Sequence, residues 1–135
     1  MMAGMTSPGH APHEPLPADV FARGCSSRGA LQHLTGRWGA LTIVALRLAD
    51  EPMRFSEVRR RVDGISDRML SQTLGDLERD GMVVRTVHST IPPHVTYALA
   101  PLGLRVADPL QQLTAIIESE LPSVLEARAL YDESH

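Results

Sequence analysis

Residues 64–81 read GISDRMLSQTLGDLERDG and contain a helix start, a helix stop and two helix faces of opposite character. Ser66 can accept hydrogen bonds from the free N–H groups of the first turn, and Asp67 suits the positive end of the helix dipole. Gly81 supplies a residue for the left-handed conformation that ends many helices. The stretch therefore predicts one helix of about four turns.

The two faces of this predicted helix differ in chemistry. Leu70, Leu74 and Leu77 recur at i, i+4 and i+7, so they form an apolar stripe that must pack on another part of the chain. A second face carries Arg68, Ser71, Gln72 and Gly75. Arginine and glutamine make paired hydrogen bonds to base edges, and glycine leaves room for close approach. Such a helix is typical of the recognition helix of a helix-turn-helix, although every surface helix turns polar residues outward.

The residues upstream predict two supporting helices. Residues 38–48 (WGALTIVALRL) are apolar on nearly all sides, which indicates a buried central helix, and residues 26–35 favour a short helix before it. After Pro52, Ser56 is a candidate N-cap for a helix with Val58 and Val62 facing inward. Two short helices joined by a tight turn that contains glycine are the helix-turn-helix arrangement.

After Gly81 the pattern changes from helical to extended. Residues 82–88 and 95–99 are rich in β-branched residues, and we interpret residues 89–94 (STIPPH) between them as a turn too long for a tight hairpin. A two-stranded ribbon directly after a recognition helix is a wing. Its tip would lie beside the phosphates or in the minor groove.

The C-terminal third predicts a long helix over residues 102–121, begun by Pro101, and a shorter helix after Pro122. Pro109 should kink the long helix or begin a fresh segment. One side of the predicted long helix is apolar and consists of Leu102, Val106, Leu110, Leu113 and Ile117. The termini carry more apolar surface than one copy needs, so we expect a homodimer with recognition helices ~34 Å apart. The alternative is that the terminal helix folds back on its own domain.

Length and composition indicate one domain over residues 20–135, preceded by a disordered leader over residues 1–19 with four prolines. No apolar run approaches the ~20 residues needed to cross a bilayer, and no signal peptide is visible, so we expect a cytoplasmic protein without membrane contact. The net charge of -3 is unevenly distributed along the chain. Residues 37–105 hold ten arginines against eight acidic residues, whereas residues 106–135 hold one against six.

The chain shows no sign of an enzyme, a metal site or a cofactor site. It has no Gly-rich phosphate loop, metal-ligand cluster or nucleophile elbow. Its one cysteine, Cys25, excludes an internal disulfide and a CxxC zinc site. Cys25 precedes a predicted helix and stands near Arg23 and Arg28, which favours a reactive thiolate, while a small buried apolar residue is the other interpretation.

Four stretches together resemble the HxlR-type winged helix-turn-helix transcriptional regulators, which are similar in architecture to the MarR type. They are residues 35–38 (TGRW), 54–60 (RFSEVRR), 64–72 with 77–81 (GISDRMLSQ and LERDG), and 92–99 with 102–103 (PPHVTYAL and LG). The resemblance covers residues 25 to about 105. It implies a mainly α fold with a small β-wing (α+β), in which N- and C-terminal helices form a dimer. It also draws attention to Cys25, because some members of the group sense oxidants or electrophiles at a cysteine in this position. This sequence departs from the family pattern where Ser26 replaces the usual proline, Thr35 replaces a usual glycine and His94 replaces a frequent wing arginine.

We therefore predict a sequence-specific DNA-binding transcriptional regulator, a repressor that binds double-stranded DNA as a homodimer. The alternative is a winged-helix protein-interaction module without specific DNA binding. The predicted effector is an oxidant or electrophile at Cys25, or a small apolar ligand near Trp38 at the dimer interface. The predicted DNA-contacting residues are Arg54, Ser56, Arg59, Arg60, Ser66, Arg68, Ser71, Gln72, Arg85, His88, Thr90 and His94.

Overall fold

The computed structural model describes residues 17–135, which divide into two compact units between Gln32 and His33. The leader predicted for residues 1–19 lies almost entirely outside the described residues. The larger unit holds the whole predicted helix-turn-helix and wing. No helix within residues 17–135 is long and apolar enough to cross a lipid bilayer.

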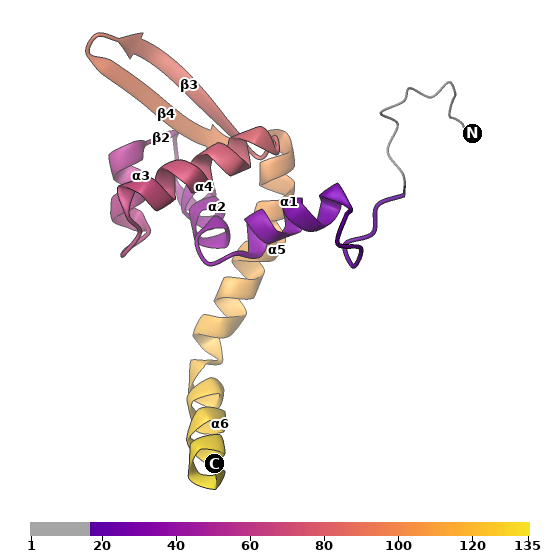
Figure 1. The fold of residues 1–135 in the computed structure, drawn as a ribbon. Helices are drawn as coiled ribbons and strands as arrows, with labels where there is room; N and C mark the ends of the chain where they lie inside the picture. The colour runs from indigo at the N-terminus through magenta and orange to yellow at the C-terminus, as the bar shows by residue number, and fades with distance from the viewer. Residues whose placement is uncertain (1–16) are drawn as a thin grey trace. The chain divides into compact units, whose positions relative to one another are not determined.

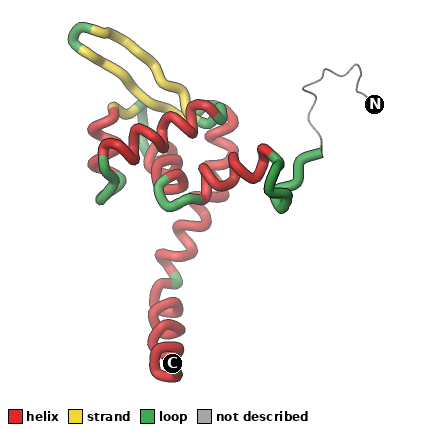
Figure 2. The backbone as a smooth tube through the Cα atoms, in the orientation of Figure 1, coloured by secondary structure: helices red, strands yellow, loops and turns green. Residues whose placement is uncertain are grey.

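Helices make up most of the described chain, and three strands form one small sheet (Figures 1 and 2). In chain order the elements are α1 (Ser26–Thr35), α2 (Gly39–Leu48), β2 (Met53–Arg54), α3 (Phe55–Arg61), α4 (Asp67–Arg79), β3 (Val83–Thr90), β4 (Pro93–Leu99), α5 (Pro101–Ser119) and α6 (Leu121–Ser134).

Helix α2 lies at the centre of the larger unit. It packs against α3, α4, α5 and β4, and five consecutive residues from Thr42 to Leu46 are buried. Its apolar sequence suits a helix with several packing partners, although Leu41 and Leu48 are 44% and 48% exposed. The predicted buried central helix is confirmed, and it supports both helices of the helix-turn-helix.

Helices α3 and α4 form the predicted helix-turn-helix, with one correction at the start of α3. Ser56 is not the N-cap, because α3 begins one residue earlier, at Phe55. The backbone N–H of Arg54 donates instead to Glu57 Oε1 at 2.8 Å. Between the helices, Gly64 adopts a φ of 91°, a conformation that favours glycine, and buried Ile65 anchors the turn in the core.

The sheet is antiparallel in the order β2-β4-β3, and β3 and β4 form a hairpin that projects beyond the helices (Figure 1). The predicted long turn is wrong. Ser89 and Thr90 pair with His94 and Pro93, so only two residues remain between the strands. Proline is tolerated there because it is the first residue of its strand, where no ladder bond needs its nitrogen. The two-residue strand β2, which pairs with β4, was not predicted.

Helix α5 begins at Pro101 as predicted, but it runs through Pro109 without starting a new segment. Gly103, Ala107 and Leu110 of α5 are buried. The other residues of the predicted apolar side are exposed or half-buried: Leu102, Val106, Leu113 and Ile117. Small residues let α5 approach the body closely, since a Cβ on Gly103 would collide with the Met82 carbonyl oxygen. Helix α6 follows α5 and has no buried residue.

Candidate nucleic-acid interface

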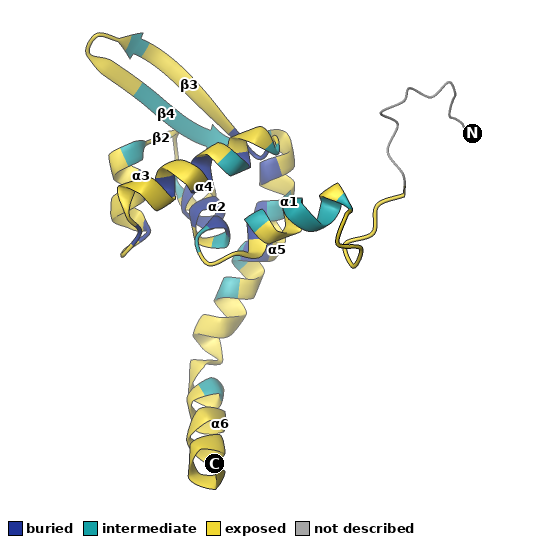
Figure 3. Cartoon of the chain, in the orientation of Figure 1, coloured by how far each residue is buried: buried dark blue, intermediate teal, exposed yellow. Residues whose placement is uncertain are grey.

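The two predicted faces of α4 are both present. Leu70, Leu74 and Leu77 are at most 2% exposed and face the core. On the other side all four polar-face residues are exposed, and Figure 3 shows that side of α4 in yellow. They are Arg68, Ser71, Gln72 and Gly75. Because the buried leucines hold the helix on the core, the exposed side chains on its opposite face are available to contact a partner.

The start of α4 is held by Ser66, as predicted. Its Oγ accepts the backbone N–H of Met69 at 3.1 Å. Because a serine hydroxyl also carries one donor, the O–H of Ser66 stays available to a further acceptor such as a phosphate oxygen. The first turn of α4 therefore offers hydrogen-bond donors at a positive helix end, which suits an anion.

The predicted arginines beside α4 have different environments. Arg59 of α3 donates from Nη1 to Asp67 Oδ1 of α4 at 2.7 Å, and Arg60 next to it is exposed. Arg54 of β2 donates from Nη2 to the carbonyl oxygen of Pro93 at 3.2 Å. That bond ties the short strand to the first residue of β4, next to the hairpin turn.

The wing brings its two histidines together. His88 and His94, on opposite strands, have ring centroids 4.6 Å apart, and His88 Nε2 lies 2.8 Å from Thr96 Oγ1. The shift in pairing register between Val87 and Ser89 leaves His88 out of the ladder. Arg85 and Thr90, the other wing residues predicted to touch DNA, are exposed. The wing thus presents polar side chains along its length.

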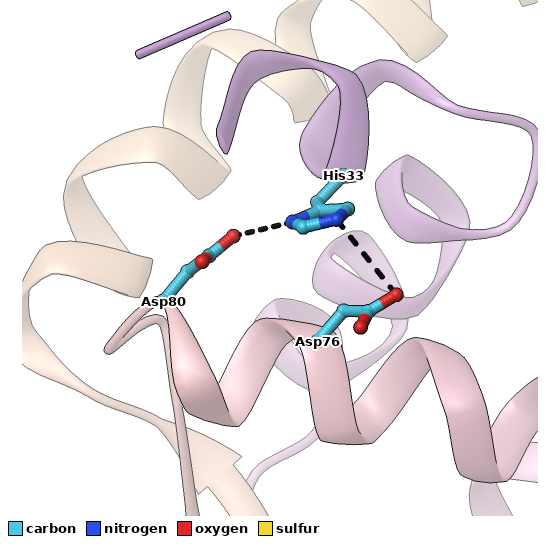
Figure 4. A network of polar contacts seen from close by, with 3 residues as sticks. All are labelled: His33, Asp76 and Asp80. Carbon is cyan, nitrogen blue, oxygen red and sulfur yellow. Dashed lines mark hydrogen bonds and ion pairs between the residues drawn. The ribbon is translucent and has the colours of Figure 1, made fainter. Parts of the chain in front are cut away.

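A polar contact that the sequence did not reveal joins the last turn of α1 to α4 (Figure 4). The His33 ring lies between two carboxylates, with Nδ1 2.6 Å from Asp80 Oδ2 and Nε2 3.8 Å from Asp76 Oδ2. His33 and Asp80 are 47 residues apart, so no local pattern signals their pairing. The contact braces the C-terminal half of α4, the end away from its proposed DNA-reading turns.

In the smaller unit, Cys25 is half-buried directly before α1. Its pKa lies below the usual range for a thiol, chiefly because the backbone N–H of Asp19 donates to the sulfur at 3.4 Å. The Ser27 hydroxyl, 3.1 Å from Sγ, lowers the pKa further, while partial burial and the Asp19 carboxylate raise it. The predicted thiolate character therefore has a structural basis, although it comes from Asp19 and Ser27.

Trp38 is half-buried and packs against the core, with the Arg37 guanidinium carbon 4.7 Å from its ring centroid. A cavity of about 450 Å³ lies nearby, among α2, the end of α3 and α5, but Trp38 is not among its lining residues. Within residues 17–135 no three metal-ligating side chains gather. The role of Trp38 beside a ligand remains a prediction.

Comparison with known proteins identifies the family. The family model described as HxlR-like helix-turn-helix matches residues 33–124. This chain belongs to the HxlR-like helix-turn-helix family. The match begins in the last turn of α1 and ends in α6, so it includes the helix-turn-helix, the wing and all of α5.

Relatives of this HxlR-like protein are transcriptional regulators. The HTH-type transcriptional regulator YtfH of Escherichia coli is 46% identical over 110 residues, which is 82% of this chain and 86% of YtfH. The solved structure of the regulator ytfH from Salmonella typhimurium has a TM-score of 0.77 at 46% identity, covering 83% of this chain and 98% of that one. Reduced HypR, a redox regulator, has a TM-score of 0.65 at 32% identity, covering 76% and 98%. The HxlR-like protein is therefore a winged-helix transcriptional regulator.

Proposed function

We propose that this HxlR-like regulator binds an operator in double-stranded DNA as a homodimer and represses transcription there. The observation that carries the proposal is the exposed polar side of α4. Arg68, Ser71 and Gln72 stand clear of the core on a helix whose opposite side is fully buried. Arginine and glutamine are suited to paired hydrogen bonds with guanine and adenine edges.

The phosphate contacts that accompany base reading have candidates around α4. Ser66 lies at the start of α4, Arg60 lies on the preceding helix α3, and Arg85 lies on the wing. All three are exposed. Phosphate contacts fix the register of a protein on the duplex, while base contacts read the sequence. This division suits a winged helix that inserts α4 in the major groove and lays its hairpin along the backbone.

The dimer is supported by the apolar residues that α5 and α6 leave uncovered. Seven of them are each between 45% and 61% exposed: Leu113, Ile116, Ile117, Leu121, Leu125, Leu130 and Tyr131. Exposed apolar residues in this number on two consecutive helices are typical of a protein interface. A two-fold dimer would present two copies of α4 to successive turns of one duplex.

Control by an oxidant or electrophile at Cys25 belongs to the same proposal. The lowered thiol pKa and its half-exposed position favour the nucleophilic thiolate. HypR, a similar protein by structure, is a redox regulator. With a single cysteine per chain, oxidation leads to an intersubunit or a mixed disulfide, whereas an electrophile leaves a covalent adduct on the thiol.

The decisive experiment begins with selection of a bound sequence from random duplexes by the purified protein. The affinity for the selected duplex should fall steeply as salt rises, because arginine contacts release counterions from the phosphates. The double substitution Arg68→Ala, Gln72→Ala should remove the preference for that duplex over a shuffled one. The matched control Arg105→Ala, Gln112→Ala changes the same residue types at exposed positions of α5 and should keep the preference.

A protein-interaction module is the second candidate, and the net charge of -3 favours it. Recognition of a protein through an apolar face would hardly respond to salt, whereas DNA binding must. If no duplex is enriched in the selection and the exposed side of α4 can be substituted without effect on duplex binding, the DNA-binding proposal is wrong.

A further inference from the structure

One ion pair at the start of α4 has a position that stability does not explain. Arg59 Nη1 and Asp67 Oδ1 are 2.7 Å apart, and the two side chains are 44% and 66% exposed. Exposed ion pairs contribute little to folding because water screens them and both side chains lose freedom. The pair nevertheless joins α3 to the first turn of α4, next to the side of α4 that we propose reads the bases.

The pair leaves part of the guanidinium unoccupied. Arg59 uses one N–H group in the bond to Asp67, and a guanidinium carries five in a rigid plane. The bond therefore holds the remaining donors in one orientation beside α4. In a helix-turn-helix the first helix crosses the DNA backbone, so a phosphate is the acceptor that Arg59 on α3 is placed to meet.

A held arginine and a free arginine have different effects on selectivity. A free side chain can follow any nearby phosphate, which adds affinity for every sequence equally. A guanidinium fixed by a carboxylate bonds well only when a phosphate lies at one place, and the carboxylate repels phosphates that lie elsewhere. Repulsion of the wrong geometry is a general route to specificity. Asp67 supplies both effects, since it lies on α4 itself and moves with the helix that reads the bases.

We propose that Asp67 is a specificity-determining residue, which positions the Arg59 guanidinium for one backbone phosphate of the operator. The inference rests on the proposed DNA binding and goes beyond it, because it assigns a role to an acidic residue on a surface that meets a polyanion. Asp67 acts through Arg59 and is a positioning residue.

The test compares two duplexes, the one selected by the full-length protein and a shuffled duplex of the same base composition. Asp67→Ala should bind the shuffled duplex about threefold more tightly, because a negative charge is removed, and should bind the selected duplex less tightly. The ratio of the two affinities should fall about tenfold. Glu78→Ala is the matched control, since it removes an exposed acid about three turns further along the same side of α4. It should leave the ratio unchanged.

Two further variants separate positioning from charge. Arg59→Lys keeps the charge and the salt dependence but loses the planar fork, so the ratio should fall without a change in salt slope. In an Arg59→Ala background, Asp67→Ala should lower the ratio no further. Thermal melting of each variant checks that its fold is intact.

The outcomes distinguish this inference from the proposed function. If the wild-type protein enriches no duplex, the proposed DNA binding is wrong and the inference falls with it. If the wild type selects a duplex but Asp67→Ala keeps the affinity ratio, or lowers it equally without Arg59, the positioning role of Asp67 alone is overturned.

Discussion

The thiol of Cys25 is surrounded by hydrogen-bond donors that favour its charged form. Since the Asp19 N–H and the Ser27 hydroxyl lower its pKa, alkylation by iodoacetamide should reach half its maximal rate at a lower pH than for an unperturbed thiol. Ser27→Ala removes one donor, so the half-maximum should move to higher pH. The measurement is the rate of alkylation from pH 6 to 10. An identical pH profile for the variant would contradict the role of the Ser27 hydroxyl.

His33 offers a second test on single side chains. His33→Ala should lower the free energy of unfolding by about 1 kcal/mol, because it removes the partner of the Asp80 carboxylate. Asp76→Ala should cost less, since Asp76 Oδ2 lies 3.8 Å from the ring whereas Asp80 Oδ2 lies at 2.6 Å. Urea denaturation of the variants measures both. Equal costs for His33→Ala and Asp76→Ala would show that the bond to Asp80 contributes nothing.

Two helical glycines with opposite surroundings provide a prediction for whole elements. A Cβ on Gly75 of α4 would meet no atom within 4 Å, so Gly75→Ala should stabilise the protein by about 0.5–1 kcal/mol through helix propensity. The added methyl group lies on the exposed side of α4 and should weaken binding to the selected duplex by about 1 kcal/mol. Chemical denaturation and duplex titration measure the two effects separately.

Gly103→Ala is the contrasting variant. Because its methyl group would collide with the Met82 carbonyl oxygen, it should cost about 1–3 kcal/mol of stability. The packing described for α4 is wrong if Gly75→Ala destabilises the protein. The packing described for α5 is wrong if Gly103→Ala does not.

The sequence predicts an element well when the spacing of its apolar residues and the residues at its ends indicate the same secondary structure. Leu70, Leu74 and Leu77, with Ser66 before them and Gly81 after them, specify α4 locally. Strand β2 is not predicted because its two residues are too few to show the alternating pattern of a strand. The predicted wing turn is misplaced because it includes both prolines, whereas Pro93 begins β4.

The buried side of α5 illustrates a different limit. A hydrophobic pattern points to leucines, but α5 approaches the body through Gly103 and Ala107, whose small size matters more than their hydrophobicity. Of the leucines on the predicted apolar side, Leu110 is buried, while Leu102 and Leu113 are exposed. Among the predicted site residues, exposure on α4 was foreseeable from the helical period, while the partners of Arg54, Arg59 and His88 depend on contacts between elements and were not.

For the whole molecule, the exposed apolar surface of α5 and α6 predicts the assembly state. The wild-type protein should sediment at twice the mass of the 14.7 kDa chain. The double substitution Leu113→Glu, Ile117→Glu places charges on this surface and should yield a monomer with an unchanged helical circular-dichroism spectrum, since both residues are at least half exposed. Sedimentation velocity measures the change. A wild type that is monomeric at micromolar concentration would contradict the proposed dimer.

The strict separation of leucine side and polar side on α4 has an evolutionary consequence. Substitutions at Arg68, Ser71 or Gln72 leave the buried leucines untouched, so they carry little cost in folding. After gene duplication, a daughter copy can therefore drift toward a new promoter while its scaffold stays intact. If α4 reads the operator, such regulators can acquire new target sequences through substitutions at three exposed residues of one helix.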